Sequence, residues 1–412
     1  MKKKKVIVVG GGFAGIQLIK RLDKNLFDVL LIDKLNHHQF QPLFYQVATS
    51  QIEPASISFP LRHIVKSEKN VQVRMAEVIT VNQTENNIST SIGELEYDYL
   101  AIAIGCKTNF FGNTEIEEHA FTLKTTYDAI KIRNHILQTF ERVISLPEKD
   151  RILNLVIVGA GPTGVELAGA FAEIKKNILP KDYPGIDFSK FNIILIEGSK
   201  STLNSMSKTA STASMEYLAE MGVTVITETF VNSYDGSEVI LSNGKAISTD
   251  SVIWAAGVIG NQINGFPESS FVSGKRLIVN RINKVIDCDN IFAIGDIASM
   301  GTPKFKKGHP QVANVAITQA NLLAKNLKAL VLNKPMFEYE YRDLGSMATI
   351  GNNKAVVDLP FWKFAGHLAW FIWMFLHLML ILTIRNKIVI FFDWAWKFIT
   401  KDTSLRLILT QP

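Results

Sequence analysis

Residues 6–33 read VIVVGGGFAGIQLIKRLDKNLFDVLLID, and this stretch decides the fold of the N-terminal part of the chain. It opens on β-branched residues that predict a buried strand, and Gly10, Gly12 and Gly15 follow at GxGxxG spacing. A helical pattern comes next, and a second apolar strand ends at Asp33. The first glycine permits a tight turn, the second lets a pyrophosphate approach the backbone, and the third lets the helix pack on the strand. The stretch therefore predicts a dinucleotide-binding unit in which Asp33 accepts hydrogen bonds from a ribose.

The same pattern returns in the middle of the chain. An apolar strand over residues 152–158 leads into a second GxGxxG within VGAGPTGVELAG, and the next strand, NIILIE, ends at Glu197. A carboxylate at this position accepts from ribose hydroxyls and repels a 2′-phosphate, which predicts NADH rather than NADPH. Glu166 either touches the nicotinamide end or is a helix surface residue. The residues assigned to NADH are Gly159, Gly161, Thr163, Gly164, Glu166, Glu197 and Gly257.

The chain then returns to the first unit. NIFAIGDIA, residues 290–298, is an apolar strand followed by Asp296, which either binds the ribityl hydroxyls of a flavin or caps a helix. Two such units, the second inserted in the first, predict an α/β flavoprotein with two Rossmann-like domains and a helical tail. The expected division is 1–112 and 258–335 for FAD, 113–257 for NADH, and 336–412 for membrane association. The residues assigned to FAD are Gly10, Gly12, Gly15, Asp33, Lys34, Val78, Gly105, Asp296 and Ala313.

Composition and charge exclude several classes of binding partner and reaction. The 412 residues carry a net charge of +6 and no basic stripe with interleaved aromatics, so we expect no nucleic-acid partner and no metal site. The two cysteines, Cys106 and Cys288, lie far apart in the sequence, which argues against a dithiol mechanism. A flavin needs little acid–base help from side chains, since the cofactor itself carries the electrons.

The tail differs in kind from the rest of the chain. Residues 359–384 read LPFWKFAGHLAWFIWMFLHLMLILTI, and IVIFFDWAWKFI follows after a short basic break. The many tryptophans and scattered basic residues favour a pair of interfacial helices lying in one leaflet over a membrane span. A buried or dimer-forming hairpin is the alternative. The basic residues expected to contact anionic lipid are Lys363, Arg385, Lys387 and Lys397.

Taken together, these motifs resemble the type II NADH dehydrogenases, the alternative NADH:quinone oxidoreductases, over essentially the whole chain. The motifs that carry the resemblance are the two fingerprints, FQPLFYQVATS, PASISFPLR, TNFFG, WAAGV, NIFAIGD, HPQVANVAITQA and YRDLGSMATIG. The resemblance implies a single-subunit FAD enzyme that passes electrons from NADH to a membrane quinone without pumping protons. It also implies monotopic attachment to the cytoplasmic face of the inner membrane, two substrate sites on opposite faces of the flavin, and a possible homodimer.

One helix departs from the family pattern. The quinone-side sequence AQxAxQQ is here ANVAITQ, with Asn314 and Thr318 in place of two glutamines and Gln319 retained. A polar position used by many members is occupied by Ala170, while Glu173 lies nearby. The candidate catalytic residues are therefore Gln319, Asn314 and Glu173, as quinone contacts or proton donors.

Three other functions remain open from the residues alone. A sulfide:quinone oxidoreductase would need cysteines near the flavin, and only Cys106, after the strand YLAIAIG, has a suitable position. A soluble NADH oxidase or ferredoxin reductase would not need the aromatic tail. A nucleotide-sensing protein would keep FAD but would not turn over NADH with a quinone.

Overall fold

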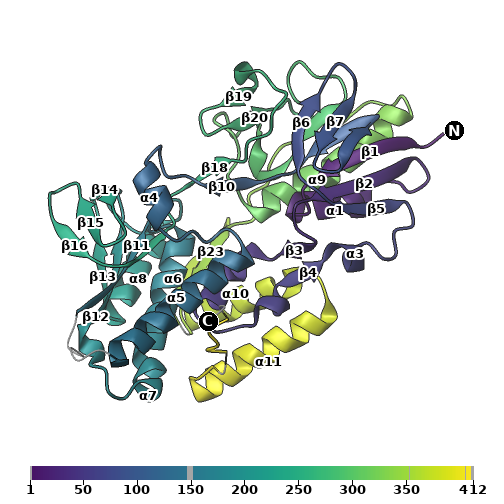
Figure 1. Cartoon of the computed structure of the whole chain (residues 1–412). Coiled ribbons are helices and arrows are strands. Elements are labelled where there is room, and N and C mark those ends of the chain that lie inside the picture. The colour runs from purple at the N-terminus through teal and green to yellow at the C-terminus, as the bar shows by residue number, and fades with distance from the viewer. Residues whose placement is uncertain (1, 146–151, 352, 404, 410–412) are drawn as a thin grey trace. The chain divides into compact units, whose positions relative to one another are not determined.

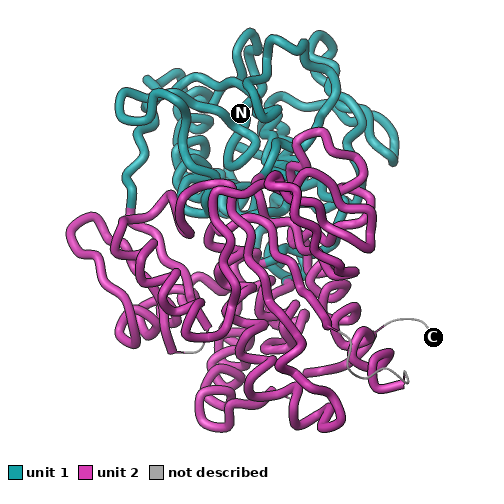
Figure 2. Tube along the Cα trace, turned by 90° about the vertical axis from the view of Figure 1, so that its left-hand side faces the viewer, with its two compact units in different colours: residues 1–39, 59–107, 258–343 teal, residues 40–58, 108–257, 344–412 magenta. Residues whose placement is uncertain are grey.

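The computed structural model describes residues 2–145, 152–351, 353–403 and 405–409. The chain forms two compact units, each assembled from three segments and coloured separately in Figure 2. The first unit comprises residues 1–39, 59–107 and 258–343, and the second comprises residues 40–58, 108–257 and 344–412. Residues 40–58 and the C-terminal segment thus belong to the same unit as the second glycine fingerprint.

The first unit is built on a parallel five-stranded sheet of order β21-β9-β1-β2-β5 (Figure 1). Val6 of β1 pairs with Val29 on one side and Tyr99 on the other, and the apolar part of β1 is fully buried. Helices α1 and α9 pack on each other and contribute to the hydrophobic core beside the sheet. The bounds are β1 Lys4–Val9, β2 Phe27–Asp33, β5 Val71–Met75, β9 Tyr99–Ile102, β21 Ile291–Ala293, α1 Phe13–Arg21 and α9 Ala313–Val331.

A small antiparallel sheet lies within the first unit. Alternation over residues 71–92 predicts a sheet of this kind, and β6, β7 and β8 form it, but residues 71–75 join the parallel sheet as the edge strand β5. Alternation of apolar and polar residues indicates only that one face of a strand is exposed. It does not distinguish a parallel edge strand from an antiparallel strand. Further bounds are β3 His37–Gln39, α3 Leu61–Ile64, β6 Val78–Asn82, β7 Asn87–Thr90, β8 Gly93–Glu96, β19 Phe271–Val272, β20 Arg276–Ile278 and β22 Ala298–Ser299.

The second unit repeats the parallel architecture with a sheet of order β13-β12-β11-β17. The second Rossmann-like unit expected from the sequence is therefore confirmed. The insert over residues 175–191 is not only a surface excursion, because Ile178 and Leu179 are buried. The bounds are α2 Phe44–Ala48, α4 Thr114–His119, α5 Thr126–Ser145, β11 Leu153–Val158, α6 Pro162–Asn177, α7 Leu179–Asp182, β12 Phe191–Ile196, α8 Lys208–Glu220, β13 Val223–Ile226, β14 Val231–Tyr234, β15 Glu238–Leu241, β16 Ala246–Ser248 and β17 Ser251–Trp254. Three short strands at or beside the unit boundaries are β4 Ser58–Pro60, β10 Cys106–Thr108 and β18 Val258–Gly260.

The C-terminal segment adds an antiparallel sheet and two helices to the second unit. The strands are β23 Ser346–Thr349, β24 Ala355–Asp358 and β25 Lys363–Gly366, and the helices are α10 His367–Leu380 and α11 Ile384–Thr400. The apolar run that begins at residue 359 thus contains the strand β25, and Gly366, at φ +102°, turns the chain into α10. In the described residues, every helix falls short of the length and apolar character that a bilayer span requires.

Candidate active site

The first glycine fingerprint forms a tight turn with one open position. A Cβ on Gly10 would lie 2.4 Å from the carbonyl oxygen of Ala103, and one on Gly15 would lie 1.9 Å from that of Gly10. A Cβ on Gly12 would meet no atom within 4 Å. Gly12 also begins α1 without a side-chain cap, so the first N–H groups of the helix face open space. This is the cradle that a pyrophosphate requires.

The second fingerprint has the same geometry in the other unit. A Cβ on Gly159 would lie 2.6 Å from Cα of Ala256, and one on Gly164 would lie 1.9 Å from the carbonyl oxygen of Gly159. Gly161, at the uncapped start of α6, is again open. Thr163 follows it as an exposed residue of the first helical turn. Each unit therefore has space and donors for one dinucleotide phosphate group.

A carboxylate stands beside each cradle and is bonded to it. Asp33 Oδ2 accepts from the backbone N–H of Gly11 at 2.5 Å. Glu197 Oε2 accepts from the N–H of Ala160 at 2.7 Å, and its Oε1 accepts from the N–H of Ser199 at 2.9 Å. These bonds hold both carboxylates at the carboxyl ends of β2 and β12, where the ribose of a bound dinucleotide lies in Rossmann folds.

The other residues assigned to FAD surround the end of β21 and the start of α9. Asp296 Oδ2 accepts from the thiol of Cys106 at 3.2 Å, and Gln319 Oε1 accepts from the N–H of Gly295 at 2.8 Å. Gln319 is therefore bound to the Gly295–Ile297 turn that carries Asp296. Asn314 directly follows Ala313 at the start of the helix, and its side chain interacts with the hydroxyl of Tyr341.

The remaining FAD candidates lie along the ends of other strands in this unit. Lys34 pairs with Glu77, which immediately precedes Val78 of β6. Gly105 has a φ of +68° and open space around its Cα. In the second unit, Gly257 has a φ of +138°, and a Cβ there would lie 3.4 Å from Phe111. Positive φ explains why glycine occupies these two positions after β9 and β17.

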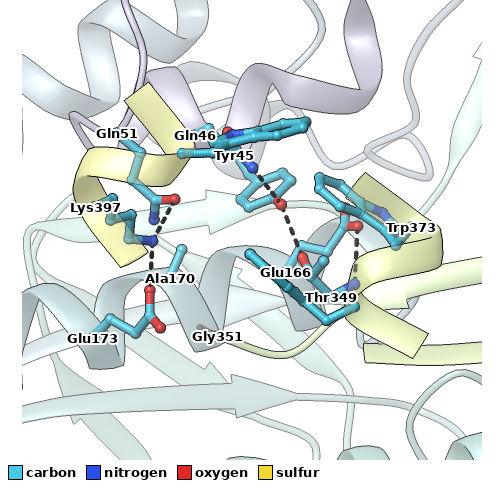
Figure 3. A pocket seen from close by; sticks show the side chains of 12 residues that line it. Tyr45, Gln46, Gln51, Glu166, Ala170, Glu173, Thr349, Gly351, Trp373 and Lys397 are labelled. Atoms are coloured by element: carbon cyan, nitrogen blue, oxygen red, sulfur yellow. Dashed lines mark hydrogen bonds and ion pairs between the residues drawn. The ribbon is translucent and has the colours of Figure 1, made fainter. Parts of the chain in front are cut away.

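A pocket in the second unit joins α6 to the C-terminal helices (Figure 3). It holds about 400 Å³ of space between atoms, part of it open to solvent. Its residues come from α2 and the loop after it, α6, β23 and the turn after it, α10 and α11. They are Tyr45, Gln46, Gln51, Glu166, Ala170, Glu173, Thr349, Gly351, Trp370, Trp373, Trp394 and Lys397.

An ion pair closes one side of this pocket. Lys397 Nζ lies 2.8 Å from Glu173 Oε2 and donates to Gln51 Oε1, also at 2.8 Å (Figure 3). Both charged side chains are nearly buried. The expectation that Lys397 contacts lipid is therefore wrong, because α11 turns this residue inward onto α6. Sequence spacing alone cannot reveal a partner 224 residues away.

A hydrogen-bonded chain lies on the other side. Tyr45 Oη and Thr349 Oγ1 are 2.8 Å apart, and the N–H of Thr349 donates to Glu166 Oε1 at 3.4 Å (Figure 3). Burial raises the pKa of Glu166 to about 8, and burial also raises the pKa of Tyr45. Glu166 is thus mostly protonated at neutral pH and carries an acidic proton inside the pocket.

Two buried donors that line the pocket have no partner in the described part of the chain. Trp373 Nε1 and the amide Nε2 of Gln51 make no hydrogen bond, and Trp373 is only 1% exposed. An unpaired buried donor is costly, so such groups commonly mark the position of a ligand acceptor. Tyr45, Gln51 and Trp373 were not predicted from the sequence as site residues, although Tyr45 belongs to the FQPLFYQVATS motif and Gln51 directly follows it.

Comparison with known proteins agrees with this arrangement. The model of the pyridine nucleotide-disulphide oxidoreductase family matches residues 4–320, and the model of the NDH2 C-terminal domain matches residues 344–401. A type II NADH:quinone oxidoreductase of Mycobacterium tuberculosis, NdhA, is 31% identical over 99% of this chain and 90% of its own length.

The chain belongs to the type II NADH:quinone oxidoreductase family. The resemblance inferred from the sequence motifs is thereby confirmed. Among relatives in this family, the Staphylococcus aureus (strain NCTC 8325 / PS 47) enzyme is 28% identical over 86% of this chain and 89% of its own length.

Solved structures show the same fold. NDH2 from Plasmodium falciparum, determined in complex with NADH, has a TM-score of 0.88 at 24% identity and covers 99% of this chain and 100% of its own. The sulfide:quinone oxidoreductase of Aquifex aeolicus has a TM-score of 0.74 at 21% identity, with 93% and 92% covered. Of the two thiols in this type II chain, Cys106 bonds to Asp296, whereas Cys288 lies 3.3 Å from Gln83 Oε1.

Proposed function

We propose that this chain passes two electrons from NADH through FAD to a membrane quinone, without pumping protons. Family membership supports this activity, as do the relatives that are named type II NADH:quinone oxidoreductases. The nucleotide cradles alone would suit many flavin reductases. The observation that carries the quinone assignment is the pocket between α6 and the C-terminal helices, which combines tryptophan side chains with unpaired buried donors.

The first unit holds FAD in this proposal. Gly10, Gly12 and Gly15 admit the pyrophosphate, Asp33 binds the adenosine ribose, and Asp296 meets the ribityl chain. Lys34, Val78, Gly105 and Ala313 complete the surroundings. When bound, FAD supplies the two-electron carrier between the nicotinamide and the quinone.

The second unit holds NADH. Gly159, Gly161, Thr163 and Gly164 cradle its pyrophosphate, and Glu197 selects its ribose. Two backbone N–H groups hold the Glu197 carboxylate as an acceptor, so it repels a 2′-phosphate and favours NADH over NADPH. Gly257 is assigned to the nicotinamide end, whereas Glu166, which the sequence assigned there, lines the pocket proposed for the quinone.

Quinone reduction consumes two protons, and the pocket offers groups that can deliver them. Glu166 carries a proton at neutral pH, and Glu173, paired with Lys397, is the second carboxyl group of the pocket. The indole N–H of Trp373 and the amide of Gln51 donate to quinone carbonyl oxygens. The candidates in the first unit are Gln319, whose Oε1 accepts from the N–H of Gly295, and Asn314.

The C-terminal helices attach the enzyme to lipid. One face of α11 carries Ile384, Ile388, Phe392, Trp396 and Ile399, all strongly exposed. One face of α10 carries Leu368, Phe371, Phe375 and Met379, also exposed. These stripes support monotopic attachment to a lipid surface. We place this surface on the cytoplasmic face of the inner membrane, as the family resemblance implies, and a homodimer is a further expectation from that resemblance.

The test is a steady-state assay of the purified yellow protein. NADH oxidation is followed by its near-ultraviolet absorbance with a short-chain quinone, then with NADPH or with sulfide as donor. Fast quinone-dependent oxidation of NADH, with NADPH much slower, is the expected result. Flavin that is reduced by NADH but not reoxidised by quinone would overturn the acceptor assignment. Quinone reduction driven by sulfide instead would identify a sulfide:quinone oxidoreductase.

A further inference from the structure

A buried arginine in the second unit has no counter-ion among the residues that the structure describes. Arg133, in the middle of α5, is 3% exposed, and its Nε and Nη2 atoms make no hydrogen bond. Within the described ranges no carboxylate pairs with it. Two other arginines of this unit do have carboxylate partners. Arg142 pairs with Asp250, and Arg406 pairs with Asp182.

The guanidinium of Arg133 lines a small cavity bounded by α2, α5, α6 and the chain after α11. The cavity has room for about one water-sized particle. Most of its wall is aliphatic or aromatic, and its polar members besides Arg133 are Thr49, Ser50, Thr403 and Arg406. Thr49 Oγ1 already donates to the carbonyl oxygen of Tyr45 at 2.7 Å. The hydroxyl of Thr403 is buried and unpaired.

The local charge is positive, and no described residue compensates that of Arg133. A guanidinium does not lose its proton at physiological pH, so Arg133 stays charged although burial lowers its pKa. Arg406 adds a second cation, but Asp182 and Asp402 offset it. A buried charge without a partner costs several kcal/mol, which makes a bound anion the most economical source of compensation.

We propose that this cavity binds one chloride-sized inorganic anion, held by Nε and Nη2 of Arg133 and the hydroxyl of Thr403. The space for a bound particle is small, which favours a small inorganic anion over a lipid headgroup. Nε and Nη2 of Arg133 can only donate and the Thr403 hydroxyl can also donate, and an anion offsets the guanidinium charge, which a water molecule does not. The anion would fasten α5 to the segment that follows the membrane helix α11. This inference is independent of the electron-transfer assignment.

The test is a linkage measurement on the purified holoenzyme. The folding equilibrium constant is measured by denaturant titration at constant ionic strength while sodium gluconate is replaced by sodium chloride. One bound chloride makes this constant rise tenfold for each tenfold increase in chloride above the Kd. Arg133→Met should abolish the dependence. Lys131→Met, which removes an exposed charge from the same helix, should retain it.

Two further measurements keep the proposal falsifiable if Arg133→Met does not fold. Thr403→Val should weaken the apparent chloride affinity severalfold. Crystals soaked in bromide should show an anomalous peak within hydrogen-bond distance of Arg133 Nε. A stability independent of chloride, as expected for a water in the cavity, would overturn the proposal. So would a chloride dependence that survives in Arg133→Met, because the anion would then bind elsewhere.

Discussion

At the scale of single residues, substitutions at two open glycines test the two nucleotide sites independently. Gly12 and Gly161 have extended backbone angles that any residue adopts, and a Cβ at either would touch nothing. We expect Gly12→Val to fold but lose flavin, because the side chain occupies the space for the pyrophosphate. Gly161→Val should keep its flavin and raise the KM for NADH at least about tenfold.

Flavin absorbance per chain, circular dichroism and KM measure these effects. Gly185→Val, at an exposed position that is equally open, is the matched control and should behave as wild type. Full flavin content in Gly12→Val would contradict the assignment of FAD to the first unit.

Glu197 governs the choice between nicotinamide nucleotides. Its carboxylate is held by N–H groups of Ala160 and Ser199, so Glu197→Gln keeps the shape of the site and removes the charge. We expect a higher KM for NADH and a ratio of NADH to NADPH efficiency that falls by about tenfold, or roughly 1.4 kcal/mol. Glu238→Gln, which removes an exposed carboxylate in the same unit, should leave the ratio unchanged. An unaltered ratio in Glu197→Gln would refute this role.

The unpaired indole of Trp373 is the third residue with a specific expectation. Trp373→Phe removes the N–H group and keeps an aromatic ring, so one hydrogen bond to a quinone carbonyl is lost. A bond of about 1 kcal/mol corresponds to a fivefold rise in the KM for quinone. Stopped-flow reduction of the flavin by NADH should not change. Trp396→Phe, on the exposed face of α11, is the control for general loss of an indole. An equal effect in both variants would argue against a quinone contact.

At the scale of elements, α11 has two faces with different tasks. Its inward face carries Asn386, Ile390, Trp394 and Lys397, and Trp394 donates to Gln46 Oε1 at 2.8 Å. Its outward face is the stripe that includes Ile388 and Phe392. The 3.6-residue period makes this division possible in a single helix.

This division predicts how attachment can be broken without loss of the pocket. Ile388→Glu combined with Phe392→Glu should reduce binding to anionic vesicles more than tenfold, because two apolar groups are replaced by charges. Activity with a water-soluble quinone should persist. Vesicle cosedimentation at low and high salt measures binding. Because Lys397 is paired with Glu173, the salt-dependent part of vesicle binding should come from Lys363, Arg385 and Lys387. Undiminished binding in the double variant would place the contact elsewhere.

At the scale of the whole molecule, the buried acid Glu166 makes stability depend on pH. Its pKa is 4.5 for a free side chain and about 8 in the folded protein, so the folded state binds more protons between these values. The contribution of Glu166 to the free energy of unfolding is therefore highest below about pH 4.5 and is lost as pH rises through about 8.

Comparison of wild type with Glu166→Gln isolates this contribution. The glutamine variant cannot ionise, so its stability relative to wild type should rise between these pH values by roughly 2–4 kcal/mol. Denaturant titrations at several pH values measure the difference. A constant difference across this range would show that Glu166 ionises normally in the folded protein.

The nucleotide units were predictable because their determinants are local. The glycine spacing, the β-branched strand before it and the acidic residue after the next strand all act within about 30 residues of the chain. The second fingerprint repeats them, so the sequence alone determined two Rossmann-like units, their cradles and the positions of Asp33 and Glu197. It also determined the apolar, tryptophan-rich character of the tail.

Only the tertiary structure decided which distant residues share a pocket. Lys397 is one of several lysines in an amphipathic tail, and its pairing with Glu173 depends on how α11 packs against α6. The raised pKa of Glu166, the unpaired indole of Trp373 and the isolated charge of Arg133 all result from burial. Burial is a property of long-range packing, because desolvation depends on every segment that surrounds a side chain rather than on its neighbours in the sequence.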